Sequence, residues 1–218
     1  MFGKIILNEL PASRDTQVTE CCFYTYKRKP ENKKENYEGG MDMVYYQDSE
    51  VTIRNLQDSD AQVITDGEIA QGWDGEGRLE KYLMRLRDQA EGKSVALVAE
   101  YHGVVAGYIN IYPDSKWGAF AGFGYPEIVD FGVLEKYRTH GIGGRLMDAA
   151  EKIASEFADT VYLGVGLHSG YGSAQRMYVR RGYIPDGGGV WYGEKVCGQY
   201  ENCCNDDDLV LYLLKKLR

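Results

Sequence analysis

The sequence has no long apolar run, few histidines and no excess of positive charge. Its 218 residues include 25 Lys and Arg against 33 Asp and Glu, a formal net charge of −8, and only 3 histidines. Proteins that bind nucleic acid through phosphate contacts carry clustered basic residues, so this balance argues against nucleic acid as the main partner. No stretch approaches the ~20 apolar residues needed to cross a bilayer, and the N-terminal residues do not form a secretory signal. We expect a cytoplasmic protein with no membrane partner.

The cysteines do not form a metal-binding pattern. The 5 cysteines comprise two adjacent pairs, Cys21 with Cys22 and Cys203 with Cys204, and the single Cys197. Zinc sites favour ligands spaced as C-x2-C, often with histidine nearby, and the histidines of this chain lie far away in sequence. We expect reduced thiols and no metal.

The first 40 residues differ in composition from the rest of the chain. The segment 27–36 is highly charged and lacks apolar periodicity, which is typical of a disordered segment. Residues 1–40 hold 7 basic and 6 acidic residues, which leaves 18 basic and 27 acidic residues for 41–218. We predict a disordered extension over residues 1–40 and one acidic domain over residues 41–218.

From residue 50 onward, strand patterns alternate with helical ones. Strand patterns cover 51–54, 94–101, 104–112, 127–133, 161–167, 189–196 and 209–214, and helical spacing covers 58–69, 78–90, 142–157 and 173–181. We expect Ser173 to cap the last of these helices. The order predicts a mixed α/β fold without internal repeats.

The segment with the clearest chemistry is Arg138-Thr139-His140-Gly141-Ile142-Gly143-Gly144, between a predicted buried strand and an amphipathic helix. Glycines at a helix N-terminus let backbone N–H groups approach an anion, and the helix dipole favours negative charge there. A dinucleotide fingerprint needs glycine where Leu146 stands, and a P-loop needs lysine where Arg145 stands. A phosphate-binding helix start is the interpretation we favour, and a tight turn without a ligand is the alternative.

This segment resembles the pyrophosphate-binding signature Q/R-x-x-G-x-G/A of the GNAT superfamily of N-acetyltransferases. Arg138, Gly141 and Gly143 match the signature position by position. The order and spacing of the other elements agree with the family from about residue 50 to the C-terminus.

Two further segments extend the resemblance. The first, Phe131-Gly132-Val133, is similar to the family strand whose backbone pairs with the pantetheine arm of acetyl-CoA. The second resembles the family's A-x-x-L-Y-x-x-x-G-F element and comprises Ala174, Met177, Tyr178, Gly182 and Tyr183. Tyr171 departs from the pattern, because many members have asparagine there, and one polar cofactor contact is therefore in doubt.

The resemblance implies a single domain with a central, mostly antiparallel, twisted sheet that is splayed at the cofactor strand and flanked by helices. It implies acetyl-CoA as cosubstrate, no metal, and direct transfer of acetyl from the thioester to a primary amine of a small molecule. The cofactor-binding residues it implies are Phe131, Gly132, Val133, Arg138, Thr139, His140, Gly141, Ile142, Gly143, Gly144 and Ser173. A non-catalytic acyl-CoA-binding sensor or scaffold with the same fold is the alternative.

The resemblance also suggests catalytic roles. Tyr178 matches the tyrosine commonly assigned as general acid, and a phenol of pKa near ~10 is protonated at neutral pH. Glu127 stands where some members place a catalytic base, and Asp130, alone among apolar neighbours, is its rival. Asp130 is either a buried, hydrogen-bonded acid or a bulge residue, and both carboxylates are dispensable if the reaction uses no side-chain base. The oxyanion donor is expected to be the N–H of Val133.

The acceptor pocket is the least determined part of the sequence. In this fold it is bounded by the first helix pair, the loop before the cofactor strand and the last hairpin, here 71–75, 117–125 and the region of Trp191 and Tyr192. Aromatic side chains beside carboxylates suit a cationic amine, although aromatic loops are as often ordinary packing. The sequence leaves the oligomeric state open, with a homodimer as one alternative.

Overall fold

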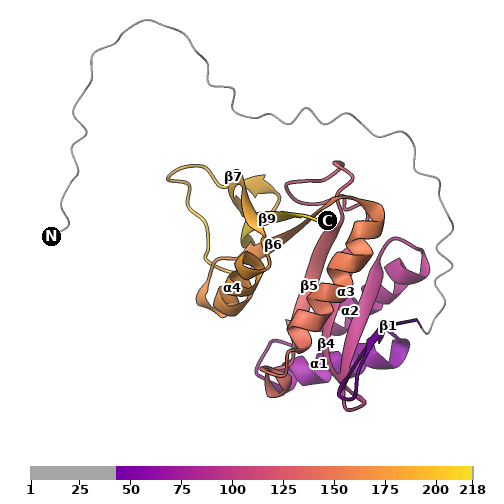
Figure 1. Cartoon of the computed structure of the whole chain (residues 1–218). Helices are drawn as coiled ribbons and strands as arrows, with labels where there is room; N and C mark the ends of the chain where they lie inside the picture. Colours follow the sequence, from indigo (N-terminus) through magenta and orange to yellow (C-terminus); the bar gives the residue numbers. More distant parts are fainter. Residues whose placement is uncertain (1–42, 218) are drawn as a thin grey trace, which may run out of the picture. The chain divides into compact units, whose positions relative to one another are not determined.

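The structure, a computed structural model, describes residues 43–217 (Figure 1). The extension expected over residues 1–40 lies outside the described residues. The described chain forms one mixed sheet with the strand order β1-β2-β3-β4-β5-β6-β9-β7-β8. Neighbouring strands are antiparallel except β5 and β6, which are parallel. The mostly antiparallel sheet with flanking helices that the family resemblance implies is therefore confirmed.

The elements follow the alternating order expected from the sequence. The strands are β1 (Val44–Gln47), β2 (Val51–Asn55), β3 (Val95–Tyr101), β4 (Val104–Tyr112), β5 (Glu127–Val133), β6 (Thr160–Gly166), β7 (Ile184–Tyr192), β8 (Lys195–Val196) and β9 (Leu209–Lys216). The α-helices are α1 (Asp58–Ala70), α2 (Arg78–Ala90), α3 (Ile142–Phe157) and α4 (Gly172–Arg180), and the 3-10 turns are η1 (Glu135–Tyr137) and η2 (Ser169–Tyr171).

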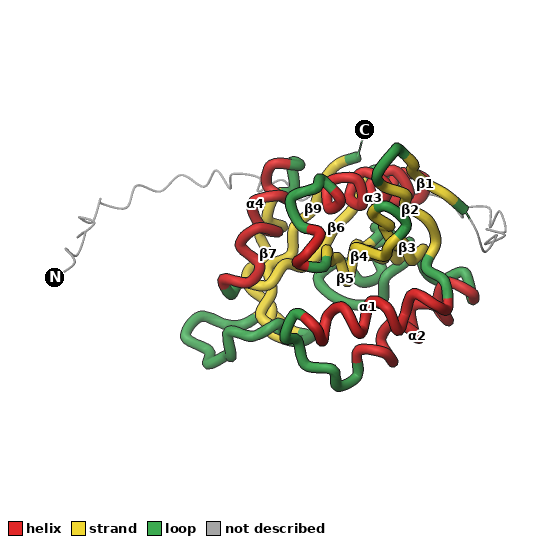
Figure 2. Tube along the Cα trace, turned by 90° about the horizontal axis from the view of Figure 1, so that it is seen from below, coloured by secondary structure: helices red, strands yellow, loops and turns green. Residues whose placement is uncertain are grey.

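The sheet is covered on both faces. Helices α1 and α2 lie on one face and α3 lies on the other (Figure 2). On the α3 face, Leu146 and Ile153 pack with Ile109 of β4 in the larger core cluster. On the opposite face, Ile64 of α1 and Tyr82 of α2 form a second cluster with those residues of β3 and β4 whose side chains alternate with the ones that face α3. Alternation along the strands therefore divides the apolar residues between two layers of core.

Strand β5 contains a bulge halfway along, and beyond it the side chains point to the opposite face of the sheet from the one that strict alternation would give. Its register with β4 shifts between Tyr108 and Asn110, and Asp130 has a φ of 48°. One extra residue in β5 moves the following residues onto the opposite parity. Ile128 and Phe131, three residues apart, consequently both pack against the α3 side of the core.

Strands β5 and β6 separate soon after they meet. Within the described chain they pair at two positions, Glu127 with Tyr162 and Ile128 with Leu163. Beyond these pairs β5 stays on β4 while β6 follows β9, and the two strands diverge (Figure 1). From residue 129 onward, the edge of β5 that faces β6 pairs with no other strand within residues 43–217.

Two local sequence predictions are wrong. Ser173 is not the N-cap of α4, because η2 runs directly into the helix and Tyr171 takes that position. The single strand expected over 189–196 is a hairpin of β7 and β8, because the chain reverses at Gly193. The short, largely exposed β1 was not anticipated, since four residues carry little pattern.

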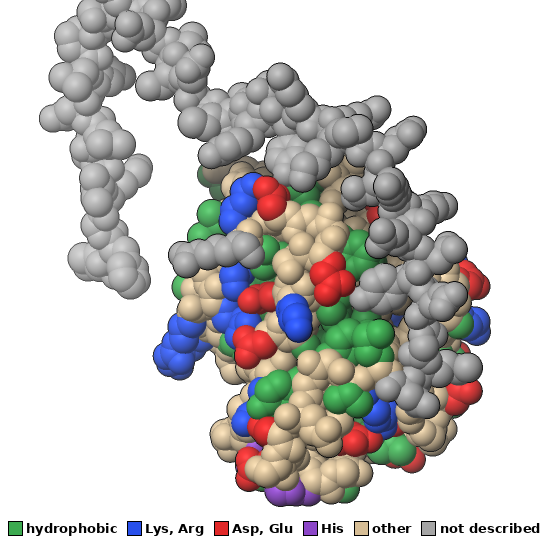
Figure 3. Space-filling model, turned by 45° about the vertical axis from the view of Figure 1, so that its right-hand side comes forward, with side chains coloured by type: hydrophobic (Ala, Val, Ile, Leu, Met, Phe, Trp, Pro, Cys, Tyr) green, Lys and Arg blue, Asp and Glu red, His purple; other side chains and the backbone are tan. Residues whose placement is uncertain are grey.

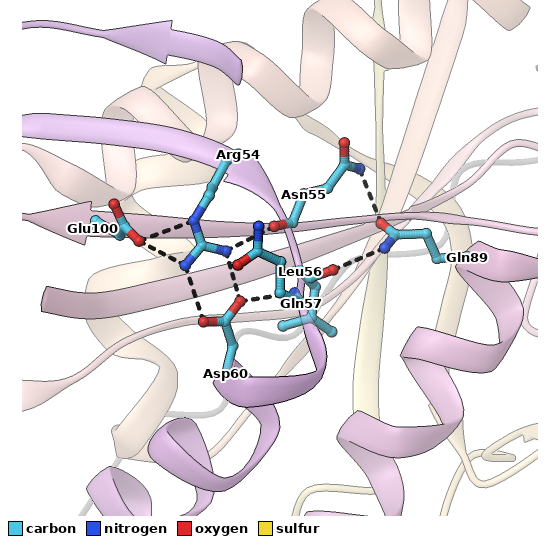
Figure 4. A network of polar contacts seen from close by, with 7 residues as sticks. All are labelled: Arg54, Asn55, Leu56, Gln57, Asp60, Gln89 and Glu100. Carbon is cyan, nitrogen blue, oxygen red and sulfur yellow. Dashed lines mark hydrogen bonds and ion pairs between the residues drawn. The ribbon is translucent and has the colours of Figure 1, made fainter. Parts of the chain in front are cut away.

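A partly buried ion-pair network fixes the start of α1 against the sheet. Arg54 of β2 pairs with Asp60 of α1 at 2.7 Å and with Glu100 of β3 at 2.6 Å (Figure 4). Asp60 also accepts a hydrogen bond of 2.8 Å from the backbone N–H of Gln57. The network ties α1 to the strands away from the separation of β5 and β6.

Charged side chains on the surface are mixed in sign. On the face that Figure 3 displays, Lys and Arg side chains stand among Asp and Glu side chains over the described residues. Arg181, for example, lies 2.6 Å from Asp148 and 2.9 Å from Glu151. Neighbouring charges of opposite sign largely cancel each other's long-range field.

Candidate active site

The start of α3 presents unpaired backbone donors. Gly141 is the N-cap with a φ of 73°, a conformation that favours glycine, and it supplies no side-chain cap. Its carbonyl accepts the N–H of Arg145 at 3.2 Å, so the N–H groups of Ile142, Gly143 and Gly144 are the donors that precede the first helical bond. Thr139 also has a positive φ of 72°. Such a loop and helix start together form a concave set of N–H groups suited to an anion.

Gly143 lies close against β5, where a side chain would be tightly packed. A Cβ at this position stands 3.2 Å from the ring of Phe131 and 3.6 Å from Val133. At Gly144, by contrast, a Cβ meets nothing within 4 Å. The predicted phosphate segment and the predicted cofactor strand are thus brought together, since Gly143 at the start of α3 lies beside Phe131 and Val133 of β5. The chain's own residues fit a pyrophosphate at this point.

The side chains of the loop before α3 are exposed and engage the loop's own backbone. Arg138 is 51% exposed, donates from Nε to the carbonyl of Val133 at 3.3 Å and pairs with Glu135 at 3.1 Å. The Nδ1 atom of His140 lies 2.9 Å from the carbonyl of Arg138. Thr139 donates its hydroxyl to the same carbonyl at 2.5 Å. Exposed ion pairs are weak, so Arg138 is free to exchange Glu135 for an incoming anion.

The N–H of Val133 points away from β4. Leu134 donates its N–H to Ala106 at 2.9 Å, and Val133 stands opposite Gly107. Because bonded and non-bonded pairs alternate in an antiparallel ladder, the N–H and C=O of Val133 both face the other side. The hydrogen bond from Arg138 to that carbonyl agrees with this direction. A backbone donor therefore faces the gap between β5 and β6.

Tyr178 lies on the same side of β5 as the phosphate segment. The ring of Phe131 is 6.4 Å from that of Tyr178, and its other edge faces Gly143. Tyr178 is buried, and burial raises the pKa of its hydroxyl above the ordinary value. Ser173, also expected near the cofactor, is exposed in the first turn of α4. Tyr171 directs its hydroxyl to Asp207 at 3.0 Å.

Glu127 lies at the point where β5 and β6 begin to separate. It pairs with Tyr162 of β6 and is 6% exposed. Burial raises the pKa of its carboxyl to about 7, and the hydrogen bond from the hydroxyl of Ser115 together with the nearby hydroxyl of Tyr162 offsets part of that effect. A carboxylate with this pKa is poised to accept a proton near neutral pH.

Asp130 lies in the bulge with a φ of 48°, and its side chain is hydrogen-bonded but only partly buried, at 21% exposure. Its carboxylate accepts a hydrogen bond of 2.6 Å from Nε of Arg85 in α2. Arg85 also donates to the hydroxyl of Tyr112 and stacks over that ring at 5.1 Å.

Sequence reasoning missed Arg85, Ser115 and Tyr162. A signal for Arg85 was present, because it lies three residues after the buried Tyr82 and therefore on the inner face of α2.

Aromatic side chains surround Glu127. The ring of Tyr162 lies 5.0 Å from Phe120 and 6.2 Å from Tyr212, and Tyr212 lies 5.5 Å from Trp191. The hydroxyl of Tyr162 donates to the carbonyl of Trp117 at 3.1 Å. Two of the three regions expected around the acceptor, 117–125 and the last hairpin, thus meet beside the carboxylate.

The loop between β8 and β9 is anchored near the third region. His168 lies 2.9 Å from Asp207, and Gly170 donates its N–H to the other ring nitrogen at 3.1 Å. Hydrogen bonds from His168 and Tyr171 lower the pKa of Asp207, and the positive charge of Arg78 adds to the effect. Arg78 begins α2, so this loop approaches the connection between α1 and α2.

Two properties of the described residues bear on the kind of site. No helix in residues 43–217 is long and apolar enough to cross a membrane. The same part of the chain holds no group of three or more His, Cys, Asp or Glu side chains arranged to bind a metal ion.

Comparison with known proteins gives consistent matches. Residues 57–183 match the model of the acetyltransferase (GNAT) family. The chain is 30% identical over 128 residues to an uncharacterized N-acetyltransferase of Chlorobaculum tepidum, covering 56% of this chain and 72% of that protein.

Solved structures share the fold. An acetyl transferase from Salmonella typhimurium that modifies the N-terminal serine of ribosomal protein L7/L12 has a TM-score of 0.60 at 10% identity, covering 81% of this chain and 100% of that one. A ribosomal L7/L12 alpha-N-protein acetyltransferase in complex with coenzyme A has a TM-score of 0.59 at 9% identity, covering 80% and 98%.

Proposed function

The chain belongs to the GNAT family of acetyltransferases and carries out acetyl-CoA-dependent acetylation, and we propose that its acceptor is the primary amine of a small molecule. The observation that carries this proposal is the buried carboxyl of Glu127, with a pKa of about 7, at the separation of β5 and β6. The aromatic rings around it support an acceptor small enough to reach a carboxylate that is 6% exposed.

In the proposed binding mode, three groups hold acetyl-CoA. The N–H groups at the start of α3 and the guanidinium of Arg138 bind the pyrophosphate. The free edge of β5, from Phe131 to Val133, pairs with the pantetheine arm in the gap that β6 leaves. Gly143 keeps the path between these groups clear of side-chain atoms. Bound in this way, acetyl-CoA supplies the activated acetyl group.

In the proposed reaction, Glu127 removes a proton from the acceptor ammonium, directly or through one water. The free amine attacks the thioester carbonyl, and the N–H of Val133 donates to the oxygen on which negative charge develops. The C–S bond then breaks while the hydroxyl of Tyr178 donates a hydrogen bond to the departing sulfur. The nitrogen loses its second proton, which passes to that sulfur so that coenzyme A leaves as the thiol, and Glu127 releases its own proton to solvent. Because burial raises the pKa of Tyr178, the hydroxyl stays protonated and acts mainly as a hydrogen-bond donor.

Asp130 is less suited to act as the base. Its carboxylate is held in an ion pair with Arg85 at 2.6 Å, and this contact would have to break before the carboxylate could reach an acceptor amine. Glu127 makes no such ion pair with any residue of the described chain, 43–217, which supports its assignment.

The acceptor class is tested with the full chain and acetyl-CoA by following thiol release. The amines are spermidine, phenethylamine and kanamycin, and a peptide with a free N-terminal serine represents a protein acceptor. We expect at least one small amine to have a kcat/KM about tenfold or more above that of the peptide. A preference for the peptide contradicts the small-molecule acceptor. Tight binding of coenzyme A without turnover of any acceptor favours the sensor or scaffold.

The variant Tyr178→Phe tests the role of the hydroxyl. We expect kcat to fall about 10- to 100-fold with little change in the KM for acetyl-CoA, because the donor acts only as the sulfur departs. Tyr183→Phe is the matched control, since that ring is also buried and lies 5.8 Å from Tyr178. Steady-state kinetics on both variants decide the matter, and equal rates for Tyr178→Phe and the unaltered chain remove Tyr178 from the mechanism.

A further inference from the structure

We propose that Arg85 is a positioning residue for acetyl transfer, because its ion pair with Asp130 holds the bulge of β5 and so orients Glu127 and the N–H of Val133. The inference rests on the proposed function of Glu127. It assigns a role to a side chain of α2 that lies 45 residues before its partner in the sequence.

Arg85 is fixed on several sides. Its Nε donates to Asp130 at 2.6 Å, and the two side chains are 12% and 21% exposed. The guanidinium also donates to the hydroxyl of Tyr112, which in turn donates to Asp88 at 2.5 Å. The ring of Tyr112 lies below the guanidinium at 5.1 Å. A guanidinium held in this way can fix the position of β5 relative to α2.

The backbone conformation of the bulge has to be stabilised by contacts with neighbouring residues. Asp130 has a φ of 48°, in a region that side chains other than glycine seldom occupy, so the surrounding structure has to maintain it. The bulge lies between Glu127 and Val133, and the inserted residue sets the facing of the strand on either side. If the bulge relaxes, the N–H of Val133 rotates away from the gap between β5 and β6, because a shift of one residue exchanges the two sides of a strand.

Arg85 and Asp130 also act on Glu127 through their charges, in opposite directions. The groups that face Glu127 are Ser115, Tyr162 of β6, Tyr212 of β9, Arg85 and Asp130. The positive charge of Arg85 lowers the pKa of Glu127, and the negative charge of Asp130 raises it. Removing either partner breaks the same ion pair but shifts the titration of Glu127 in opposite directions.

The experiment compares Arg85→Gln, Arg85→Lys and Asp130→Asn with the control Arg54→Gln, which breaks a partly buried ion-pair network elsewhere in the fold. The first readout is a ¹³C NMR titration of the Glu127 carboxyl. The second is the affinity for coenzyme A by calorimetry, so neither readout needs the acceptor. Melting temperatures of all four variants show whether each is folded.

We expect the midpoint of the Glu127 titration to rise by about half a pH unit in Arg85→Gln and to fall in Asp130→Asn. Both variants bind coenzyme A about tenfold more weakly, as the loss of one well-placed hydrogen bond predicts. Arg85→Lys keeps the positive charge. Its titration midpoint and its affinity for coenzyme A should therefore lie between those of Arg85→Gln and those of the unaltered chain. Arg54→Gln changes neither readout, although its melting temperature falls as well.

Two outcomes overturn the proposal. If Arg85→Gln and Arg54→Gln give the same titration and the same affinity, Arg85 has only a structural role. If the titration moves but the affinity for coenzyme A does not, Arg85 acts through its charge and does not hold the bulge. A failure of the proposed function is distinguishable, because Glu127→Gln then keeps full turnover while the effects of Arg85 on coenzyme A binding remain.

Discussion

Replacing Glu127 with glutamine is expected to lower kcat/KM by about 10²- to 10⁴-fold, the usual contribution of a positioned general base. Glutamine has nearly the same shape and keeps a hydrogen-bond acceptor for the hydroxyl of Ser115. The variant therefore removes the ability to accept a proton with little change in packing. Acetyl transfer to the best amine of the panel is the measurement.

The pH dependence provides a second, independent test. The carboxyl of Glu127 has a pKa of about 7, raised from 4.5 by burial, so the base is protonated and inactive below that pH. We expect kcat/KM of the unaltered chain to rise with pH through about 7 and then level. The acid limb should be absent in Glu127→Gln.

Whereas kcat/KM is expected to rise with pH, the contribution of Glu127 to the free energy of unfolding is expected to fall. Because the folded-state pKa lies above the unfolded one, ionisation of Glu127 opposes folding, and this cost grows as pH rises from about 4.5 to 7. Glu127→Gln should thus gain melting temperature relative to the unaltered chain at pH 8 but not at pH 4. The control is Asp114→Asn, which removes an exposed carboxylate from the loop that precedes β5. Full activity in Glu127→Gln with an intact acid limb assigns the base to another group.

Substitution of Gly143 by glutamate is expected to weaken binding of coenzyme A more than 100-fold. A Cβ at this position already lies 3.2 Å from the ring of Phe131, and the longer side chain has to extend over the N–H groups of α3. Its negative charge then occupies the place of the pyrophosphate, where the helix dipole favours anions. Calorimetric titration with coenzyme A measures the loss directly.

Gly143→Gln separates bulk from charge at the same position. We expect it to weaken binding less than glutamate does, with the difference shrinking at high salt because only the charge is screened. A melting temperature close to that of the unaltered chain confirms that the core is intact. Unchanged affinity in Gly143→Glu removes the pyrophosphate from the start of α3.

Much of the architecture was predictable from local pattern. The helices over 78–90 and 142–157 and the strand over 127–133 have the bounds that apolar spacing predicted. In these segments burial and periodicity agree, so tertiary contacts reinforce the local preference. The loop before α3 was predicted from the spacing of its glycines, because its backbone geometry depends on these glycines.

The surroundings of the carboxylates were not predictable in the same way. Ser115 contacts Glu127 from a loop twelve residues away, and Arg85 reaches Asp130 across 45 residues. Such contacts depend on how helices and strands pack against one another. The spacing of apolar residues predicts each element but not this packing. A lone aspartate in an apolar strand indicated a buried acid or a bulge, and its partner became visible only once α2 was placed over β5.

In the proposed binding mode, coenzyme A would add a second backbone connection between two halves of the sheet that β5 and β6 join only briefly. Two halves of the sheet, β1 to β5 and β6 with β9, β7 and β8, share one ladder of two residue pairs. A molecule that pairs with the free edge of β5 completes the sheet as a tenth strand would. By mass action, a ligand at 100 times its Kd adds about 2.7 kcal/mol to the free energy of unfolding. If coenzyme A binds as proposed, the folded chain is therefore more resistant to unfolding when coenzyme A is abundant than when it is scarce.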